Sequence, residues 1–269
     1  MYNIVYNIHH IRAMLIPILH SGLGNQLFQF ATIFATAKSL NISFGINTDL
    51  IIRSSHATID YAVTIFKNVI EKYRTACQAN DVISTHDYIT DDMIMKIKND
   101  TSAGNVIGMH GYFQCEPVFR GFRNEITSML NIGYKTPVIE KAFFIHFRRG
   151  DYVNTTFWRD LTTYHKHVIA RVLEFEPDAV IYVVSDDIEY CREQVEYLRE
   201  LSRCVFVEGL NEIETLNLMS RCELGGAAAN STFSWWGLYL NYKRPLLFIP
   251  DYYEHKRYGF PEAEFIPTE

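Results

Sequence analysis

Apolar runs separated by short polar breaks recur along the chain and indicate alternating strands and helices. The runs with strand character are rich in aromatic and β-branched residues, whereas the segments between them repeat their apolar residues at helical spacing. Such alternation implies parallel sheets with helices on their faces. The predicted strands cover residues 13–19, 42–46, 81–84, 105–109, 142–147, 178–184, 204–207, 224–229 and 245–249, and the predicted helices cover 27–37, 60–74, 91–98, 115–130, 161–175, 188–201, 212–220 and 231–242.

A break at residues 133–137 separates two series of strands and helices. The segment begins with a glycine and ends with a proline, which interrupt regular structure and favour a turn. We therefore predict an α/β fold of two domains with parallel sheets, one over residues 1–136 and the other over residues 137–269.

The strand predicted at residues 142–147 ends abruptly in Arg148, Arg149, Gly150 and Asp151. The Gly-Asp pair is a turn signal, so both guanidinium groups should leave the sheet at its carboxyl edge, where open α/β sheets bind ligands. A guanidinium group stays charged and can bind two oxygens at once, which suits a phosphate. The alternative is a surface ion pair between one of these arginines and Asp151.

Two further strand ends in the second half carry polar clusters. Because the carboxyl ends of parallel strands share one edge of a sheet, these clusters can converge with the arginines on one ligand. Guanidinium groups and helix-start amides would bind a diphosphate, and an aspartate could accept hydrogen bonds from guanine nitrogens or ribose hydroxyls. The aspartate pair could instead be a metal-binding pair, but its place at a strand end favours nucleotide contact. The clusters are Ser185-Asp186-Asp187 and Asn230-Ser231-Thr232-Phe233-Ser234, whose Asn, Ser and Thr side chains could also cap the helix that follows.

The first predicted strand runs into a glycine turn and then a helix. Gly22 and Gly24 could let the backbone approach a ligand, and the helix start offers unpaired amides with a positive dipole end. A plain tight turn is the alternative, since the spacing of a dinucleotide-binding glycine motif is incomplete.

The bulk composition narrows the class of protein. The chain has 269 residues, 48% of them hydrophobic, and a net charge of -6, which argues against nucleic acid or an anionic membrane as the main partner. Its five cysteines show no disulfide or zinc pattern. Charged and histidine residues interrupt every apolar run before a signal peptide or membrane span is reached. A soluble, cytoplasmic protein is expected.

Several motifs together resemble a known family. The motifs occur in the same order as in that family and span residues 14–250. They are GLGNQLFQFA at 22–31, GYFQ at 111–114, HFRRGDYV at 146–153, VSDD at 184–187, LMS at 218–220 and NSTFSWWG at 230–237. This set resembles the α-1,2-fucosyltransferases of glycosyltransferase family 11.

The resemblance implies a GT-B-like pair of Rossmann-type domains, with the acceptor side in the first and the donor GDP-β-L-fucose in the second. It also implies inversion at the anomeric carbon, no required metal or other cofactor, and a galactose-terminated glycan as acceptor. Residues carried over as donor contacts are His146, Arg148, Arg149, Ser185, Asp186, Asp187, Asn230, Ser231, Thr232 and Phe233. Arg148 resembles the arginine that clamps the diphosphate, and Asn25 stands where related enzymes place an asparagine near the transferred sugar.

The sequence leaves two routes by which the acceptor hydroxyl could lose its proton. Asp151 is the only carboxylate beside the arginines, although Arg149 should lower its pKa and make it a better orienter than base. The alternative is a dissociative transition state in which the departing phosphate takes the proton. The chain departs from the family at Ser21, where a glycine is usual, and at His165, where a tyrosine is common.

The expected activity is transfer of L-fucose to O2 of a terminal β-galactose. Two alternatives remain. One is a transferase that uses the same donor with another acceptor or linkage, and the other is a nucleotide-sugar or glycan-binding protein without catalytic turnover. Trp235, Trp236 and Tyr239 are expected mostly in the core, with an acceptor sugar platform as the alternative.

Overall fold

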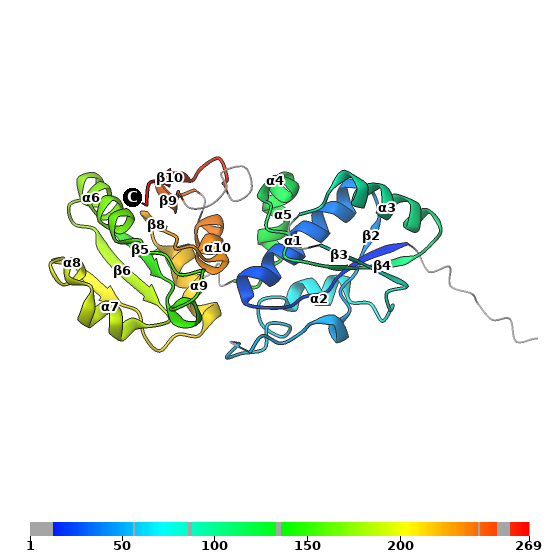
Figure 1. Cartoon of the computed structure of the whole chain (residues 1–269), viewed down its shortest axis with the longest axis horizontal. Coiled ribbons are helices and arrows are strands. Elements are labelled where there is room, and N and C mark those ends of the chain that lie inside the picture. Colours follow the sequence, from blue (N-terminus) through cyan, green and yellow to red (C-terminus); the bar gives the residue numbers. More distant parts are fainter. Residues whose placement is uncertain are drawn as a thin grey trace, which may run out of the picture.

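The computed structural model describes residues 13–55, 57–85, 88–132, 136–241, 243–251 and 259–268. They form two lobes, each built around a parallel sheet (Figure 1). The N-terminal sheet has the order β2-β1-β4-β3 and the C-terminal sheet has the order β10-β9-β8-β5-β6-β7. The predicted α/β class with parallel sheets is therefore confirmed. Residues 133–135, at the predicted domain boundary, lie outside the described residues.

The N-terminal lobe places one long helix over its sheet. Helix α1 packs on β1 and β2, and all but three of its residues are buried, which explains its run of apolar side chains. The strands of this lobe are β1 (Met14–Pro17), β2 (Ser43–Phe44), β3 (Asp81–Ser84) and β4 (Val106–His110). Its helices are α1 (Leu23–Ser39), η1 (Thr48–Leu50), α2 (Lys67–Tyr73), α3 (Asp91–Ser102), α4 (Glu116–Phe119), η2 (Arg120–Phe122) and α5 (Arg123–Met129).

The C-terminal lobe is built around β5 (Ala142–Phe147), which lies between β6 and β8 and is buried at every residue. Phe143 and Ile145 pack on one face with α6, whereas Phe144 packs on the other with α9 and α10. A strand covered on both faces is expected to be continuously apolar. The other strands are β6 (Val180–Ser185), β7 (Cys204–Phe206), β8 (Gly225–Ala227), β9 (Leu246–Pro250) and β10 (Glu264–Ile266). The helices are η3 (Gly150–Tyr152), α6 (Thr162–Phe175), α7 (Ile188–Gln194), α8 (Glu196–Arg199), α9 (Glu212–Arg221) and α10 (Thr232–Leu240).

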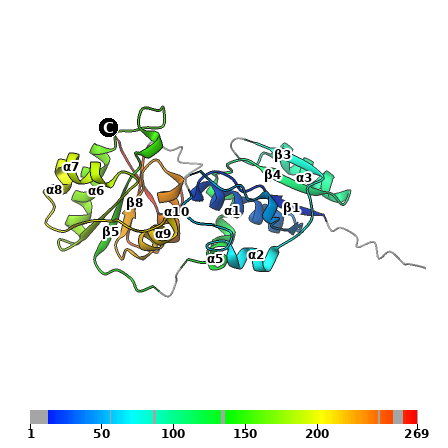
Figure 2. The same ribbon diagram turned by 90° about the horizontal axis from the view of Figure 1, so that it is seen from below.

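Aromatic side chains join the two lobes. Phe28 of α1 lies 4.5 Å from the ring of Trp235 on α10, and Phe119 of α4 stacks on Trp236 at 5.9 Å. Figures 1 and 2 both show α1 and α10 side by side between the sheets. The two tryptophans and Tyr239 are at most 1% exposed. Their expected place in the core is confirmed, and they cannot form a sugar platform.

Several element boundaries differ from the prediction. Only Lys67–Tyr73 of the helix expected at 60–74 is helical, because turns occupy the preceding residues. The helix expected at 188–201 is interrupted at Val195, whose extended backbone separates α7 from α8. Strand β10 was not predicted, since three residues at a sheet edge give little periodic signal. The predicted end of the last helix, Tyr242, lies outside the described residues.

No helix in the described part of the chain is both long enough and apolar enough to cross a membrane.

Candidate active site

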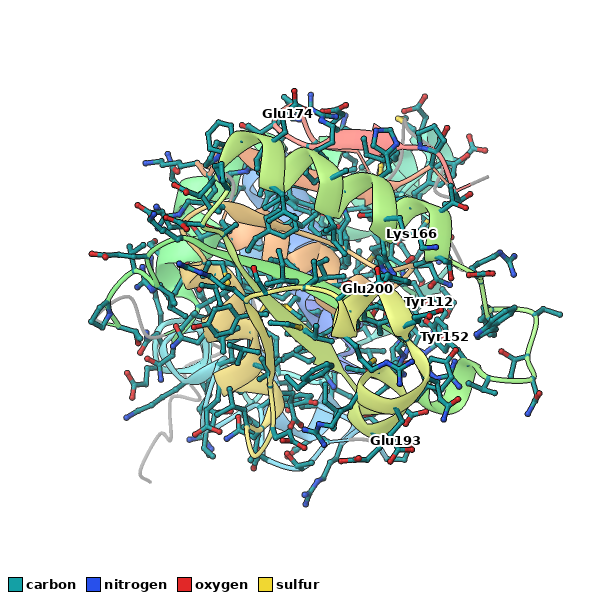
Figure 3. All side chains as sticks on the ribbon, turned by 90° about the vertical axis from the view of Figure 1, so that its left-hand side faces the viewer. Tyr112, Tyr152, Lys166, Glu174, Glu193 and Glu200 are labelled. Atoms are coloured by element: carbon teal, nitrogen blue, oxygen red, sulfur yellow. The ribbon has the colours of Figure 1, made fainter. Side chains whose placement is uncertain are left out.

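A cleft of about 860 Å³ lies between the lobes, at the carboxyl ends of β1, β5 and β6. Both lobes contribute to its walls, including Tyr112 and Tyr152, which are labelled in Figure 3. Of the residues predicted from the sequence, the following line this cleft: Asn25, His146, Arg148, Asp151, Ser185, Asp186, Ser231, Thr232 and Phe233. The expected convergence of polar strand ends is therefore present.

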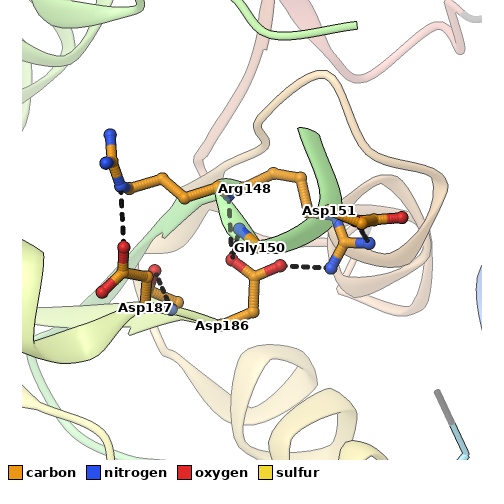
Figure 4. Close-up of polar contacts among 7 residues, drawn as sticks. Arg148, Gly150, Asp151, Asp186 and Asp187 are labelled. Carbon is orange, nitrogen blue, oxygen red and sulfur yellow. Dashed lines mark hydrogen bonds and ion pairs between the residues drawn. The ribbon is translucent and has the colours of Figure 1, made fainter. Parts of the chain in front are cut away.

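Arg148 is held from two sides (Figure 4). Its Nη1 donates to Asp186 and its Nη2 donates to Asp151, so the guanidinium group is fixed between two carboxylates. The guanidinium carbon also lies 4.8 Å from the ring centre of Tyr152. The side chain keeps 25% of its surface exposed, which leaves part of the guanidinium group available to a ligand. The predicted ion pair with Asp151 exists, but within the cleft rather than on an outer surface.

Asp186 anchors this arrangement to the backbone. Its Oδ1 accepts hydrogen bonds from the backbone N–H groups of Arg149, at 2.8 Å, and Gly150, at 3.2 Å. A Cβ at position 150 would lie 2.5 Å from Asp186 Oδ2, so a larger residue there would displace this carboxylate. The turn after β5 and the turn after β6 are thereby locked together, and Arg148 is preorganised before any ligand arrives.

Three of the predicted donor contacts do not line the cleft. Arg149 stacks on the Tyr190 ring, with 3.2 Å from its guanidinium carbon to the ring centre, and donates to Asp187 at 3.1 Å. Asp187 also caps α7 by accepting from the backbone N–H of Tyr190. The Nδ2 of Asn230 donates to the carbonyl of Phe157 at 2.6 Å. These side chains support the loops that surround the cleft.

Two helices begin at the cleft. The N-terminus of α1 follows Gly22 and that of α10 follows Ser231, and both residues line the cavity. Ser231 does not cap its helix with its side chain, contrary to the prediction, because its hydroxyl makes no hydrogen bond to the first turn. Unpaired amides at two helix starts favour an anion at this place. Gly24 lines the cleft, as a glycine that admits a ligand would, and it also lets the two helix starts approach, because a Cβ there would meet the backbone of Thr232 and Phe233 at 2.5 Å.

His146 is a buried neutral group in the wall beside Arg148. Its ring lies edge-on to Phe233 with 6.0 Å between ring centres, and its Nδ1 has no hydrogen-bond partner among the residues that the structure describes. Burial lowers the pKa of His146, and the positive charge of Arg148 acts in the same direction, while Asp186 opposes it. An uncharged imidazole here can accept or donate one hydrogen bond to a ligand.

The opposite wall comes from the N-terminal lobe and carries mostly uncharged polar groups. Asn25 Oδ1 accepts from Gln114 Nε2 at 2.8 Å, which fixes the amide and leaves its NH₂ group as a donor. Ser21 has a positive φ of 66°, a conformation that favours glycine. Arg53, an exposed residue, is the cation on this wall among the described lining residues.

A carboxylate of the C-terminal lobe connects the two walls. Glu212, at the start of α9, accepts hydrogen bonds from the backbone N–H of Thr58 at 2.8 Å, from the Thr58 hydroxyl and from the Tyr61 hydroxyl at 2.9 Å. Burial acts to raise the pKa of Glu212, but the hydrogen bonds from Thr58 and Tyr61 outweigh it, so the net shift is downward.

Sequence reasoning missed this contact and most of the N-terminal wall. The residues missed are Arg53, Ser54, Ser55, Thr58, Tyr61, Tyr112, Leu210, Glu212 and Thr215. The available signal was the capping box of α9, in which Asn211 and Glu214 cap each other. It locates a helix start, and hence Glu212, but not the loop that Glu212 binds.

A smaller hollow of about 350 Å³ extends the cleft past the end of β6. It shares Val184, Ser185, Asp186, Leu210 and Thr215 with the cleft. Its remaining lining adds apolar side chains and one carboxylate: Ile188, Val207, Glu208 and Gly209. A flat heterocycle fits such a site, since apolar walls cover its faces and polar groups bind its edge.

No group of three or more His, Cys, Asp or Glu side chains suited to a metal ion occurs in the described ranges.

A family model described as glycosyl transferase family 11 matches residues 9–267. The chain belongs to this family. It is 27% identical over 263 residues to an α-1,2-colitosyltransferase of Escherichia coli, covering 86% of this chain and 89% of that protein. It is also 23% identical over 278 residues to the O-antigen biosynthesis glycosyltransferase WbnK of Escherichia coli, covering 83% of this chain and 89% of that protein.

Solved structures show the same fold. POFUT1 in complex with GDP-fucose matches with a TM-score of 0.55 at 12% identity, covering 87% of this chain and 95% of that chain. Arabidopsis thaliana FUT1 in complex with GDP matches with a TM-score of 0.50 at 13% identity, covering 89% of this chain and 71% of that chain. The family 11 chain is thus a glycosyltransferase with a GT-B-like fold, as the motifs predicted.

Proposed function

We propose that this protein is an inverting, metal-independent galactoside 2-α-L-fucosyltransferase, which transfers L-fucose from GDP-β-L-fucose to O2 of a terminal β-galactose. The observation that carries the proposal is the cleft of a family 11 chain, in which Arg148, fixed by Asp186 and Asp151, lines the same cavity as two helix starts. The solved structures of POFUT1 with GDP-fucose and FUT1 with GDP lend further support, because they share this fold.

In the proposed donor complex, the diphosphate lies against Arg148 and the amides that open α10. Arg148 supplies positive charge, and Thr232 and Phe233 supply backbone N–H groups at the helix start. Guanine occupies the hollow beyond Ser185, between Val184, Ile188 and Val207.

The same groups account for catalysis. When the bond between fucose C1 and the phosphate oxygen breaks, its electron pair stays on GDP and the diphosphate gains negative charge. Donors that are already fixed around that charge stabilise the transition state by about 3 kcal/mol or more each. Because Arg148 is held by two carboxylates, it needs no reorganisation during the reaction, and no metal ion is required for this role.

The acceptor enters from the N-terminal wall, opposite the donor. Inversion requires the galactose hydroxyl to attack C1 on the face away from the diphosphate. Asn25, Ser21 and Tyr112 face the donor wall across the cleft and are the groups proposed to contact the acceptor or the transferred sugar.

The test is incubation with GDP-fucose and lactose, with and without EDTA, followed by NMR assignment of the product linkage. An α-1,2-fucosylated product formed equally in EDTA is the expected result. Loss of transfer in EDTA would refute the metal-independent mechanism, and a different linkage would correct the acceptor position. Release of GDP and free fucose alone would identify a hydrolase, and binding without release would identify a non-catalytic module.

A second donor is supported by the relative named as a colitosyltransferase. Colitose is L-fucose without its 3-hydroxyl group, so the two donors differ by one polar group. Comparing kcat/KM for GDP-fucose and GDP-colitose decides between them. A site that hydrogen-bonds the 3-hydroxyl discriminates strongly against its absence, whereas an apolar contact discriminates weakly.

A further inference from the structure

The carboxylates that line the cleft are all engaged by hydrogen-bond donors in the described structure. Asp151 accepts from Arg148, Asp186 accepts from Arg148 and two backbone amides, and Glu212 accepts from Thr58 and Tyr61. A carboxylate that already accepts hydrogen bonds has fewer lone pairs left for the proton of an acceptor. The proton of the acceptor hydroxyl therefore needs another destination.

A histidine and a serine lie together on the acceptor wall. His20 Nδ1 is 3.0 Å from Ser21 Oγ, and Ser21 lines the cleft. The histidine ring is fixed by its neighbours: it stacks on His110 at 4.5 Å and meets Tyr112 edge-on at 5.4 Å. The backbone N–H of His20 donates to Gln29 Oε1 at 2.9 Å. The pair thus has a defined orientation toward the cavity.

The second ring nitrogen of His20 faces away from solvent. Nε2 is buried and makes no hydrogen bond in the described structure. When the neutral ring carries its proton on Nε2, Nδ1 keeps a lone pair that can accept the Ser21 hydroxyl proton.

Ser21 adopts a backbone conformation that a serine does not favour. Its φ of 66° lies in the left-handed region, where a glycine would be unstrained. Strained residues that persist at a cleft point to a function for the side chain. A glycine at this position would relieve the strain but would lack the hydroxyl group.

We propose that Ser21 and His20 form a proton relay for the acceptor, a role that rests on the proposed transferase function. The acceptor oxygen bonds to C1 of the donor sugar as the bond from C1 to the phosphate oxygen breaks, and the electron pair of that bond stays on the nucleoside diphosphate. The acceptor hydroxyl proton passes to Ser21 Oγ, while the Ser21 hydroxyl proton passes to His20 Nδ1. After the product leaves, the Nδ1 proton returns to Ser21 Oγ as the Ser21 hydroxyl proton passes to water in the cleft, so that atoms and charge balance. Ser21 is the catalytic residue, and His20 acts through it.

The relay needs a neutral His20 at the start of each turnover. Burial lowers the pKa of His20 and His110 acts in the same direction, while the Gly111 backbone opposes them. Among the described residues, Tyr112 and Ser21 also face the ring, and Arg148 and Asp151 lie on the far wall of the cleft. Since the pKa lies below 6.5, the relay is active at neutral pH and fails as the pH falls through that pKa.

The test uses His20→Asn, Ser21→Ala and Ser21→Gly in the full chain. Transfer kcat should fall about 100-fold in each, the range for loss of general base catalysis, with GDP affinity by calorimetry unchanged within twofold. The His20→Asn side chain can still hydrogen-bond the serine. In this variant, the decline of kcat/KM at low pH that is assigned to His20 should disappear. Ser21→Gly should raise Tm while lowering kcat, a combination that a purely structural serine would not give.

Asn41→Gly is the matched control. Asn41 also has a positive φ, 54°, but lies at the end of α1 away from the cleft. This variant should raise Tm without a change in kcat. Native transfer rates in both Ser21 variants, or an unchanged decline at low pH in His20→Asn, would overturn the relay but not the proposed transferase function. A native protein that transfers no sugar from any GDP-sugar would overturn the proposed function, and the relay with it.

Discussion

The two walls of the cleft differ in how they hold their polar groups. On the C-terminal wall, Arg148 is fixed by two carboxylates, and one of these is fixed in turn by backbone amides. On the N-terminal wall, the Asn25 amide contacts the uncharged side chain of Gln114 and the Ser21 hydroxyl contacts the ring of His20. Groups that stabilise a developing charge must be preorganised, whereas groups that contact a neutral sugar need mainly position. The difference matches a donor wall and an acceptor wall.

The largest expected effect comes from Arg148→Ala. Because it removes the fixed charge of the donor wall, transfer should fall about 100- to 1,000-fold, and GDP should bind more weakly by calorimetry. Arg148→Lys keeps the charge but loses the two-pronged geometry, and an intermediate loss is expected. Arg171→Ala removes a half-buried arginine that pairs with Glu264 outside the cleft and should leave both values unchanged. Equal activity in all three variants would remove Arg148 from the site.

The contact between the walls can be broken at Gly24. A methyl group there would meet the backbone of Thr232 and Phe233, so Gly24→Ala should separate the starts of α1 and α10 and destabilise the protein by about 1–3 kcal/mol. Gly121→Ala is the control, since a Cβ at that position has nothing within 4 Å. Chemical denaturation of both variants measures the difference. A Gly24→Ala protein as stable as the control would show that the helix starts are not in close contact.

Asp151→Asn tests whether Asp151 only orients Arg148 on the donor wall. If Asp151 only orients Arg148, the loss should be several-fold, because Asp186 still holds the guanidinium group. The corresponding Asp186→Asn change should be larger, since Asp186 also anchors two backbone amides. The steady-state kcat of the two variants shows which substitution costs more activity. A loss of about 100-fold or more in Asp151→Asn would instead make this residue the general base.

The smallest effect is expected at Glu212, which joins the walls. Glu212→Gln should cost about 1 kcal/mol of stability by weakening the hydrogen bonds from Thr58 and Tyr61. The pKa of Glu212 is lowered in the folded protein, so its contribution is complete above the ordinary value of 4.5 and is lost as the pH falls through the folded pKa. The difference in Tm between native and variant should therefore shrink below pH 4.5. A constant difference would contradict this linkage.

Much of the fold could be predicted because its signals are local. The apolar run of β5 predicts a strand buried on both faces, and β3 occupies the residues that the pattern indicated. The convergence of Arg148, Asp186 and Ser231 also followed from one rule, that parallel strands end at a common edge.

The acceptor wall could not be predicted in the same way. Thr58 and Glu212 are 154 residues apart in the chain, and the loop that carries Thr58 has neither helical nor strand periodicity. Ser21 was noted as a departure from the family, but only its backbone angle shows what the departure costs. Likewise, Arg149 and Asp187 have the residue types of ligand contacts, and only their stacking and capping partners reveal their supporting role.

The aromatic side chains shared between the lobes have a consequence for folding. Phe28 and Phe119 from the first lobe and Trp235 and Trp236 from the second belong to one continuous core. Neither lobe can shield these rings from water by itself, so a fragment ending near residue 136 would expose Phe28 and Phe119. Synthesis of the last helix is therefore needed before the first lobe is complete, and heat should melt both halves in a single transition.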